Sequence, residues 1–372
     1  MKILICATQF KGGSVQVVLS LLNEFKNFAE HEYIVAVGDV VERQLDKESF
    51  PANFTFYPVP TFSSSKRKQL NRRAKWMSQL EEEHLPDAVL MSSGPVYWTS
   101  KTPMLMGYNL PAYIYPESPY WNNRTLVQRL RWRARMMLHR HLFRKEAVAW
   151  FVQTDDVNLR LKKWLERDAV YTISNTVSNV FKNPKQYPDK LPARTEGEFR
   201  FLTITAFYLH KNLEIIPDVI AELKKRGIGN VKFVVTLQDE FFRLAFRGQS
   251  TEGIVNVGPV KSDECPSLYK ECDYMFLPTL LECFSASYAE AMMTERPIVT
   301  TDMGFAHTVC GNAALYYKPM DAVAAADQIE KLINDKEQQE TLVLRGKSQL
   351  KKFGTAADRA RQVLDLLEKI RK

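Results

Sequence analysis

The stretch Tyr274-Met-Phe-Leu-Pro-Thr-Leu-Leu-Glu282-Cys-Phe-Ser-Ala-Ser-Tyr-Ala-Glu290-Ala-Met-Met-Thr-Glu-Arg-Pro297 holds the most informative pattern of the chain. Its apolar opening, Tyr274–Leu277, predicts a buried strand, and Pro297 predicts the end of a short helix that carries Glu290. A strand, a polar turn and a helix start together place backbone N–H groups where they can bind an anion. Glu282 and Glu290 flank that turn, so both carboxylates can hold sugar hydroxyl groups.

The spacing of these two carboxylates resembles a known signature. The retaining, GT-B-fold glycosyltransferases of family four carry Glu-x7-Glu, usually as Glu-Gly-Phe-Gly-x4-Glu-Ala-Met-Ala-x-Gly-x-Pro. Six positions match it, namely Glu282, Phe284, Glu290, Ala291, Met292 and Pro297. Cys283, Ser285 and Glu295 stand where the family has glycines. An ordinary capping box, Ser287-Tyr-Ala-Glu290, explains the second carboxylate equally well when it is taken alone.

The resemblance implies a role for each part of this stretch. Glu290 is expected to accept hydrogen bonds from the ribose of a nucleoside-diphosphate sugar. Glu282 is expected to contact the hexose and the positive charge that develops on its anomeric carbon. The backbone N–H groups of Phe284, Ser285, Ala286 and Ser287 are expected to hold the departing diphosphate.

A second segment, Phe201-Leu-Thr-Ile-Thr-Ala-Phe-Tyr-Leu-His-Lys-Asn-Leu213, is similar to the family's strand, loop and helix ending in Lys-Asn. The resemblance implies that Lys211 neutralises the donor diphosphate. The arginine that usually assists this lysine would fall near Ala206 and is missing, so His210 is a candidate substitute. The alternative for Lys211 is a solvated surface lysine.

Three glycines are further donor-site candidates. Asn256-Val-Gly258-Pro-Val260, followed by Leu268-Tyr-Lys-Glu-Cys-Asp273, is similar to the family stretch whose backbone holds the nucleotide base. Gly12 and Gly13 resemble the family's N-terminal loop beside the donor phosphate. Each of these glycines can equally be an ordinary turn residue.

The acceptor is expected in the first half of the chain. The family often places a histidine after the fourth or fifth strand there, but this chain has Tyr113-Ile-Tyr-Pro-Glu-Ser118 in that region. Glu117 or Tyr115 is therefore the candidate acceptor-site residue. A plain loop role for Glu117 is the competing interpretation.

Length and periodicity predict two α/β domains. The 372 residues suffice for two cores, and strand patterns alternate with helix patterns throughout, which indicates largely parallel sheets. The fold expected from the resemblance is GT-B, two Rossmann-like doubly wound domains facing a cleft. We predict an acceptor domain at 1–178, a linker at 179–197 and a donor domain at 198–372, with the last helix a candidate to pack back on the first domain.

The strands that the pattern predicts are Lys2–Ala7, Tyr33–Val37, Ala88–Met91, Ala112–Tyr115, Ala149–Val152, Ala169–Ile173, Phe199–Ile204, Val231–Thr236, Tyr274–Leu277 and Pro297–Thr300. Helical spacing runs over Val15–Phe28 and Leu213–Lys225, with Gly227 as the stop of the second helix.

The net charge of +8 is concentrated in the first half. Residues 1–174 carry 24 Lys and Arg against 17 Asp and Glu, whereas the remainder carries 27 against 26. Two segments, 66–77 and 124–145, hold cations and no acid. In the second segment Leu126, Leu130, Ala134, Met137 and Leu138 are expected in the core. Trp132, Met136 and Phe143, flanked by arginines, are then candidates to meet an anionic membrane.

A solvated helix face is the alternative for both basic segments, and a nucleic-acid partner is disfavoured because no recognisable nucleic-acid module is present. Five scattered cysteines without a CxxC pair favour a reducing cytoplasm. The opening apolar run is too short for a signal peptide, and none reaches the roughly 20 residues of a membrane span. We expect a cytoplasmic protein, with the inner face of the cell membrane as a candidate location.

The sequence therefore predicts a retaining hexosyltransferase that uses a nucleoside-diphosphate sugar and a glycan or lipid-linked acceptor in surface polysaccharide or lipopolysaccharide synthesis. Glu282, Lys211 and Glu117 are its expected catalytic residues. No Asp-x-Asp occurs, so no metal cofactor is expected. Two alternatives stay open: a sugar-nucleotide 2-epimerase of the same fold, and a non-catalytic sugar-nucleotide-binding subunit.

Overall fold

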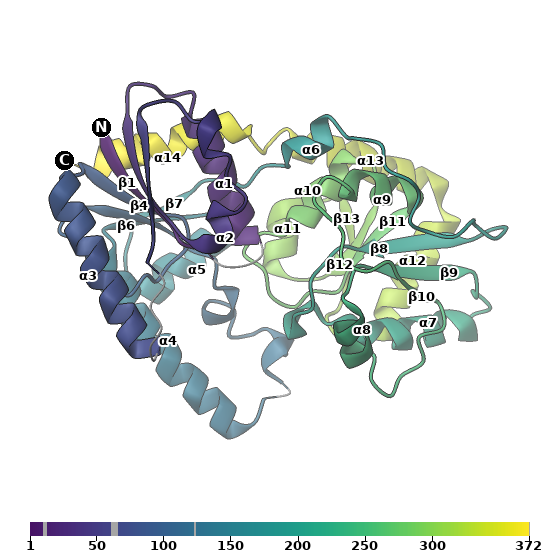
Figure 1. Cartoon of the computed structure of the whole chain (residues 1–372). Coiled ribbons are helices and arrows are strands. Elements are labelled where there is room, and N and C mark those ends of the chain that lie inside the picture. The colour runs from purple at the N-terminus through teal and green to yellow at the C-terminus, as the bar shows by residue number, and fades with distance from the viewer. Residues whose placement is uncertain (10–12, 61–65, 123, 372) are drawn as a thin grey trace. The chain divides into compact units, whose positions relative to one another are not determined.

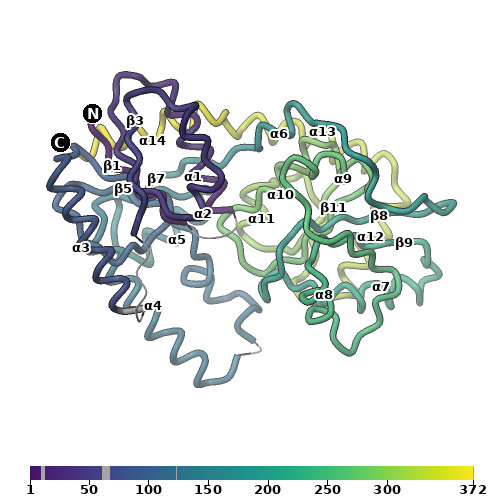
Figure 2. Tube along the Cα trace, viewed as in Figure 1, coloured from purple at the N-terminus to yellow at the C-terminus, as the bar shows by residue number. Residues whose placement is uncertain are grey.

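A computed structural model describes residues 1–9, 13–60, 66–122 and 124–371. The chain divides into two compact units (Figure 1). The first contains residues 1–114, 124–174 and 354–372, and the second contains residues 115–123 and 175–353. Both chain termini therefore belong to the first unit, as the trace in Figure 2 shows. The change of unit after Ser174 lies a few residues before the linker that the sequence predicts.

The first unit is built on a seven-stranded sheet whose neighbouring strands pair in parallel. Its spatial order is β3 (Phe54–Pro58), β2 (Glu32–Val37), β1 (Lys2–Ala7), β4 (Ala88–Met91), β5 (Met104–Gly107), β6 (Ala149–Val152) and β7 (Val170–Thr172). The helices of this unit are α1 (Gly13–Phe25), α2 (Asp39–Glu42), α3 (Lys66–His84), α4 (Leu126–Glu146), α5 (Asp155–Leu165) and α14 (Ala356–Ile370).

The second unit repeats this plan with a six-stranded parallel sheet. Its order is β10 (Ile254–Asn256), β9 (Val231–Val235), β8 (Phe199–Thr203), β11 (Tyr274–Leu277), β12 (Ile298–Thr301) and β13 (Ala314–Tyr317). Its helices are α6 (Asn179–Lys182), α7 (Ile216–Lys225), α8 (Asp239–Ala245), α9 (Cys265–Glu271), α10 (Ala286–Met293), α11 (Gly304–Cys310), α12 (Ala322–Asn334) and α13 (Lys336–Leu350). The predicted fold class, two doubly wound α/β domains, is confirmed.

Most predicted strands lie where the sequence places them, but Ala112–Tyr115 is wrong. Residues Pro111–Tyr113 form a 3-10 turn, and the strand of this region is β5. Proline at the start of that turn cannot donate to a strand ladder. Strands β3, β5, β10 and β13 were not predicted from the sequence. Gly227 ends α7 in the left-handed region with φ of 79°, as expected for a helix stop.

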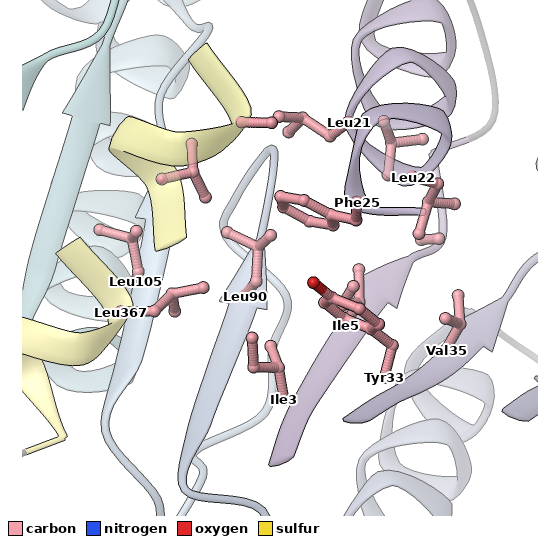
Figure 3. Close-up of a cluster of buried hydrophobic side chains, with 14 of the residues drawn as sticks. Ile3, Ile5, Leu21, Leu22, Phe25, Tyr33, Val35, Leu90, Leu105 and Leu367 are labelled. Atoms are coloured by element: carbon pink, nitrogen blue, oxygen red, sulfur yellow. The ribbon is translucent and has the colours of Figure 1, made fainter. Parts of the chain in front are cut away.

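The core of the first unit lies between its sheet and the helices α1 and α14. Ile3 and Ile5 of β1 face this core, and Phe25 of α1 stacks on Tyr33 of β2 with ring centroids 5.4 Å apart. Figure 3 shows Phe25 directed at the strands, with Leu367 of α14 beside Leu105 of β5. The last helix therefore completes a core whose strands come from the beginning of the chain.

The buried and exposed faces of helix α4 are the reverse of those predicted from the sequence. The stripe expected in the core is exposed, including Leu126, Leu130 and Met137. The stripe expected to be free is the packed one, because Phe143 is fully buried and the ring of Trp132 contacts that of Tyr113, with centroids 4.9 Å apart. Both stripes are apolar, so the sequence alone cannot rank them. In the part of the chain that the structure describes, no helix is both long and apolar enough to cross a bilayer.

Gly107, the last residue of β5, provides a test of the sheet packing. A Cβ atom there would lie 2.1 Å from the carbonyl oxygen of Ser92, which is backbone and cannot rotate away. Gly107→Ala should therefore lower the free energy of unfolding by about 1–3 kcal/mol, measured by chemical denaturation. Gly229→Ala is the control, since nothing lies within 4 Å of its added Cβ. Equal stability of the two variants would contradict this packing.

Candidate functional site

The candidate site lies where the strand order of the second sheet reverses. β8 and β11 are neighbours there, although 70 residues of chain lie between Thr203, the last residue of β8, and Tyr274, the first residue of β11. In open parallel α/β sheets, ligands bind outside the carboxyl ends of the strands at such a reversal. The loop after β8 carries His210 and Lys211, and the loop after β11 carries Glu282. The sheet topology therefore brings the predicted residues together.

Lys211 and Glu282 form an ion pair at this position. Lys211 Nζ lies 2.5 Å from Glu282 Oε1, and the two side chains are only 13% and 12% exposed. Thr279 Oγ1 donates a second hydrogen bond to the same carboxylate oxygen at 3.0 Å. The alternative of a solvated surface lysine is therefore wrong.

Backbone contacts hold the two loops in register. The carbonyl oxygen of His210 accepts a hydrogen bond from Leu280 N at 2.7 Å and lies 3.3 Å from Thr279 Oγ1. Ser118 Oγ donates to the carbonyl oxygen of Leu280 at 2.7 Å, and Ser118 is buried. Each of these bonds lies within two or three residues of Glu282, so together they fix the position of its carboxylate.

His210 lies among aromatic rings next to this pair. Its ring is 5.4 Å from that of Tyr208 and 6.5 Å from that of Tyr120. Burial lowers the pKa of His210 to about 4, although the nearby Glu282 acts in the opposite direction. His210 is therefore neutral at pH 7 and can offer a phosphate a hydrogen bond but no charge. The charge of the missing arginine is not replaced by this residue.

Glu290 lies inside α10, and the capping-box interpretation of it is wrong. The helix begins at Ala286 with Ser285 as its N-cap residue, so Ser287 is already helical. Tyr269 Oη donates to Glu290 Oε2 at 3.4 Å and to the carbonyl oxygen of Ser287 at 3.3 Å. Burial raises the pKa of Glu290 to about 7, against the opposing effect of the Tyr269 hydrogen bond. Near neutral pH the protonated, uncharged form of Glu290 is therefore favoured more than for an ordinary glutamate.

The start of α10 supplies the predicted anion-binding turn. The first backbone N–H groups of any α-helix lack partners within the helix and carry partial positive charge. Ser285 is buried and gives no side-chain cap, Ala286 is exposed, and Phe284 packs edge-on against Phe353 at 5.8 Å. This turn follows Glu282 directly, so an anion bound there would lie next to the ion pair.

The three glycines that the sequence suggests for the donor site lie in two separate parts of the chain. Gly258 has φ of 75° and receives support from Asn256, whose Oδ1 accepts from Gly258 N at 3.4 Å and from Leu237 N at 3.0 Å. Gly13 is the exposed first residue of α1 in the first unit. Gly12 lies outside the described residues. Gly13 belongs to the first unit and Gly258 to the second.

Glu117, the acceptor-site candidate, is exposed and belongs to the segment 115–123 that groups with the second unit. Its neighbour Ser118 bonds to Leu280, and Tyr115 packs edge-on against Phe305 at 5.7 Å. Sequence reasoning missed Ser118 and Thr279 as supports of the site. Pro-Thr after an apolar strand is the only sequence signal that could have indicated Thr279. Among the described residues, no group of three or more His, Cys, Asp and Glu could hold a metal ion.

Residues 198–335 match the model of the family described as Glycosyl transferases group 1. An uncharacterised glycosyltransferase of Methanocaldococcus jannaschii is 25% identical over 163 residues, which is 42% of this chain and 45% of that protein. The chain thus matches less than half the length of this curated relative.

Two solved structures extend the likeness to the whole chain. The Anabaena protein HepE in complex with UDP and glucose has a TM-score of 0.70 and 16% identity, over 99% of both chains. WaaG, a glycosyltransferase involved in lipopolysaccharide biosynthesis, has a TM-score of 0.71 and 15% identity, over 98% of this chain and 99% of that one. At such identity the likeness establishes the fold, which is the predicted GT-B fold.

The raised pKa of Glu290 predicts a pH-dependent effect of its substitution. The contribution of this carboxyl to stability is present below its unfolded pKa of 4.5 and is lost as pH rises through about 7. Glu290→Gln should therefore gain stability relative to the wild type between about pH 5 and pH 8, on the order of 1–3 kcal/mol. Chemical denaturation at both pH values measures it. Glu240→Gln, at an exposed position of α8, is the control, and the same pH trend in both variants would contradict the prediction.

Proposed function

We propose that this chain is a glycosyltransferase of the group 1 family, whose model matches residues 198–335, and that it transfers a hexose with retention of configuration. The donor is a nucleoside-diphosphate sugar, and the acceptor is a glycan or a lipid-linked saccharide. HepE, whose fold this chain shares, was solved with UDP and glucose, which supports a donor of this class.

The observation that carries the proposal is the pairing of Lys211 with Glu282 beside the start of α10. A cation and a row of helix N–H groups suit a diphosphate, and a carboxylate suits sugar hydroxyls. The three features occupy one strand reversal of the second sheet, so a single nucleoside-diphosphate sugar can contact all of them.

Each residue then has a defined task in the reaction. Lys211 and the N–H groups of Phe284 to Ser287 stabilise the diphosphate as its bond to the anomeric carbon breaks. Lys211 must leave Glu282 to do so, which releases that carboxylate for the hexose hydroxyls and the positive charge on the anomeric carbon. Glu290 accepts hydrogen bonds from the ribose. Gly258 lets the backbone approach the base, and Glu117 contributes on the acceptor side.

A lysine and a helix N-terminus already supply positive charge to the diphosphate, which supports activity without a metal cofactor. The acceptor belongs to surface polysaccharide or lipopolysaccharide synthesis on the cytoplasmic side of the membrane. The basic first half of the chain suits an anionic acceptor or surface, and WaaG, with the same fold, is involved in lipopolysaccharide biosynthesis.

The donor site is tested by thermal shifts against a panel of nucleoside diphosphates and their sugars, with magnesium or with a chelator. One base should raise the melting temperature in both conditions. Lys211→Met should weaken that binding about 10- to 100-fold, because a charge-assisted contact to phosphate is lost. Lys225→Met, at an exposed position of α7, is the matched control and should bind as the wild type does.

The reaction is tested with the donor that this panel identifies. Glu282→Gln should keep nucleotide binding and lose at least about 100-fold in turnover, since the charge is removed from the reacting centre. Nuclear magnetic resonance of the released or transferred sugar should show the anomeric configuration of the donor. Inverted product, wild-type turnover of Glu282→Gln, or conversion of the donor to its 2-epimer would contradict the proposal, and binding without turnover would favour the inert subunit.

A further inference from the structure

Helix α4 carries an apolar stripe that nothing in the described chain covers. Five of its large apolar side chains are between 52% and 72% exposed, namely Leu126, Val127, Leu130, Met137 and Leu138. At 3.6 residues per turn these positions, with the exposed Ala134, fall within about 120° of the helix circumference. A monomeric soluble protein rarely exposes such a continuous stripe without a function.

The opposite face of the same helix is the packed one. His139 Nε2 lies 2.8 Å from Tyr97 Oη, and its Nδ1 lies 3.0 Å from Tyr113 Oη. Phe143 packs against Tyr108 with ring centroids 5.3 Å apart. Because this face is held by the rest of the first unit, the helix cannot rotate to bury its exposed stripe.

Cations border the exposed stripe on both sides. By helical geometry, four arginines lie along one margin and two along the other, and no acidic residue occurs between positions 124 and 145. The first margin holds Arg129, Arg133, Arg140 and Arg144, and the second holds Arg131 and Arg135, while Lys145 lies within the arc of the stripe at its C-terminal end. Of these, Arg140 and Arg144 contact Glu166 of the unit itself, at 2.6 Å and 3.4 Å.

A shallow hollow of about 380 Å³ lies against the C-terminal half of this stripe. Its lining combines one apolar side chain with a group of cationic and titratable ones, and consists of Met137, Arg140, His141, Arg144 and Lys145. A phosphate with an alkyl group attached, as in a phospholipid, matches this mixture of cations and apolar surface.

The helix is formed before any partner arrives. Thr125 Oγ1 accepts a hydrogen bond from Gln128 N, and Gln128 Oε1 accepts one from Thr125 N, which completes a capping box at the N-terminus. A partner therefore does not have to supply the free energy of folding this segment.

We propose that α4 docks the protein on an anionic lipid bilayer, lying in the plane of the interface. The apolar stripe enters the boundary between headgroups and acyl chains, and the bordering cations contact lipid phosphates. A nucleic acid would satisfy the cations but leave the exposed leucines in water. The inference goes beyond the proposed transfer reaction, and vesicle binding needs no donor, so each can fail without the other.

Helix α3 has the positive charge of α4 without its exposed apolar stripe. It is also strongly basic, but none of its described side chains is an exposed large apolar one, and Met77 and Leu80 are buried. Of the two basic segments that the sequence suggests for membrane contact, only the one in α4 is therefore proposed to bind lipid. The solvated basic face of α3 provides matched control positions.

The experiment is co-sedimentation of the full chain with vesicles of phosphatidylcholine, with and without phosphatidylglycerol. The wild type should bind the phosphatidylglycerol vesicles much more tightly, and rising salt should weaken the binding. Leu130→Glu with Met137→Glu should reduce binding at least about tenfold. Leu159→Glu, at a 68% exposed position on α5, should leave it unchanged.

A second pair of variants tests whether vesicle binding depends on the cations of α4 or on positive charge anywhere on the first unit. Arg131→Glu with Arg133→Glu on α4 should lower binding several-fold more than Lys68→Glu with Lys75→Glu on α3, although both change the net charge equally. Unchanged melting temperatures confirm that all variants fold. Absence of binding by the wild type, equal loss in the α3 and α4 variants, or a change of oligomeric state caused by the α4 substitutions would overturn the proposal.

Discussion

The ion pair between Lys211 and Glu282 is the interaction on which the candidate site depends. It joins the loops that follow β8 and β11, two strands that are neighbours only because the order of the sheet reverses between them. Taking two charges largely out of water is unfavourable unless their geometry and hydrogen bonds compensate. Thr279, which donates a hydrogen bond to the Glu282 carboxylate, provides part of that support. Each side chain therefore neutralises the other until a ligand binds. A ligand that pairs with one of them releases the charge of the other.

The sequence predicted the architecture because buried parallel strands are continuous apolar runs. Lys2–Ala7, Ala88–Met91 and Tyr274–Leu277 coincide with strands of the structure. The errors occur where an apolar segment does not form a buried strand, or where one of two apolar helix faces stays exposed. Ala112–Tyr115 is apolar but follows a proline and forms a turn. In α4 two apolar stripes compete, and only the aromatic neighbours contributed by distant segments, such as Tyr113 and Trp164, decide which one is packed.

The same limit applies to the site. The spacing of Glu282 and Glu290 was readable from the sequence, because a strand and a short helix fix it locally. Ser118 could not be found in this way, since its bond to Leu280 joins positions 162 residues apart. Nor could the sequence reveal that burial keeps His210 neutral and holds the pKa of Glu290 near neutrality, because both effects arise from tertiary surroundings.

The most direct test of this account is a double-mutant cycle on Lys211→Met and Glu282→Gln, measured by chemical denaturation with and without a saturating nucleoside diphosphate. Without nucleotide the account predicts a coupling free energy of about 1–3 kcal/mol between the two side chains. With nucleotide the coupling should fall strongly, because Lys211 then pairs with phosphate. A coupling that is the same in both conditions, or absent without nucleotide, would contradict the claim that this ion pair is the donor site.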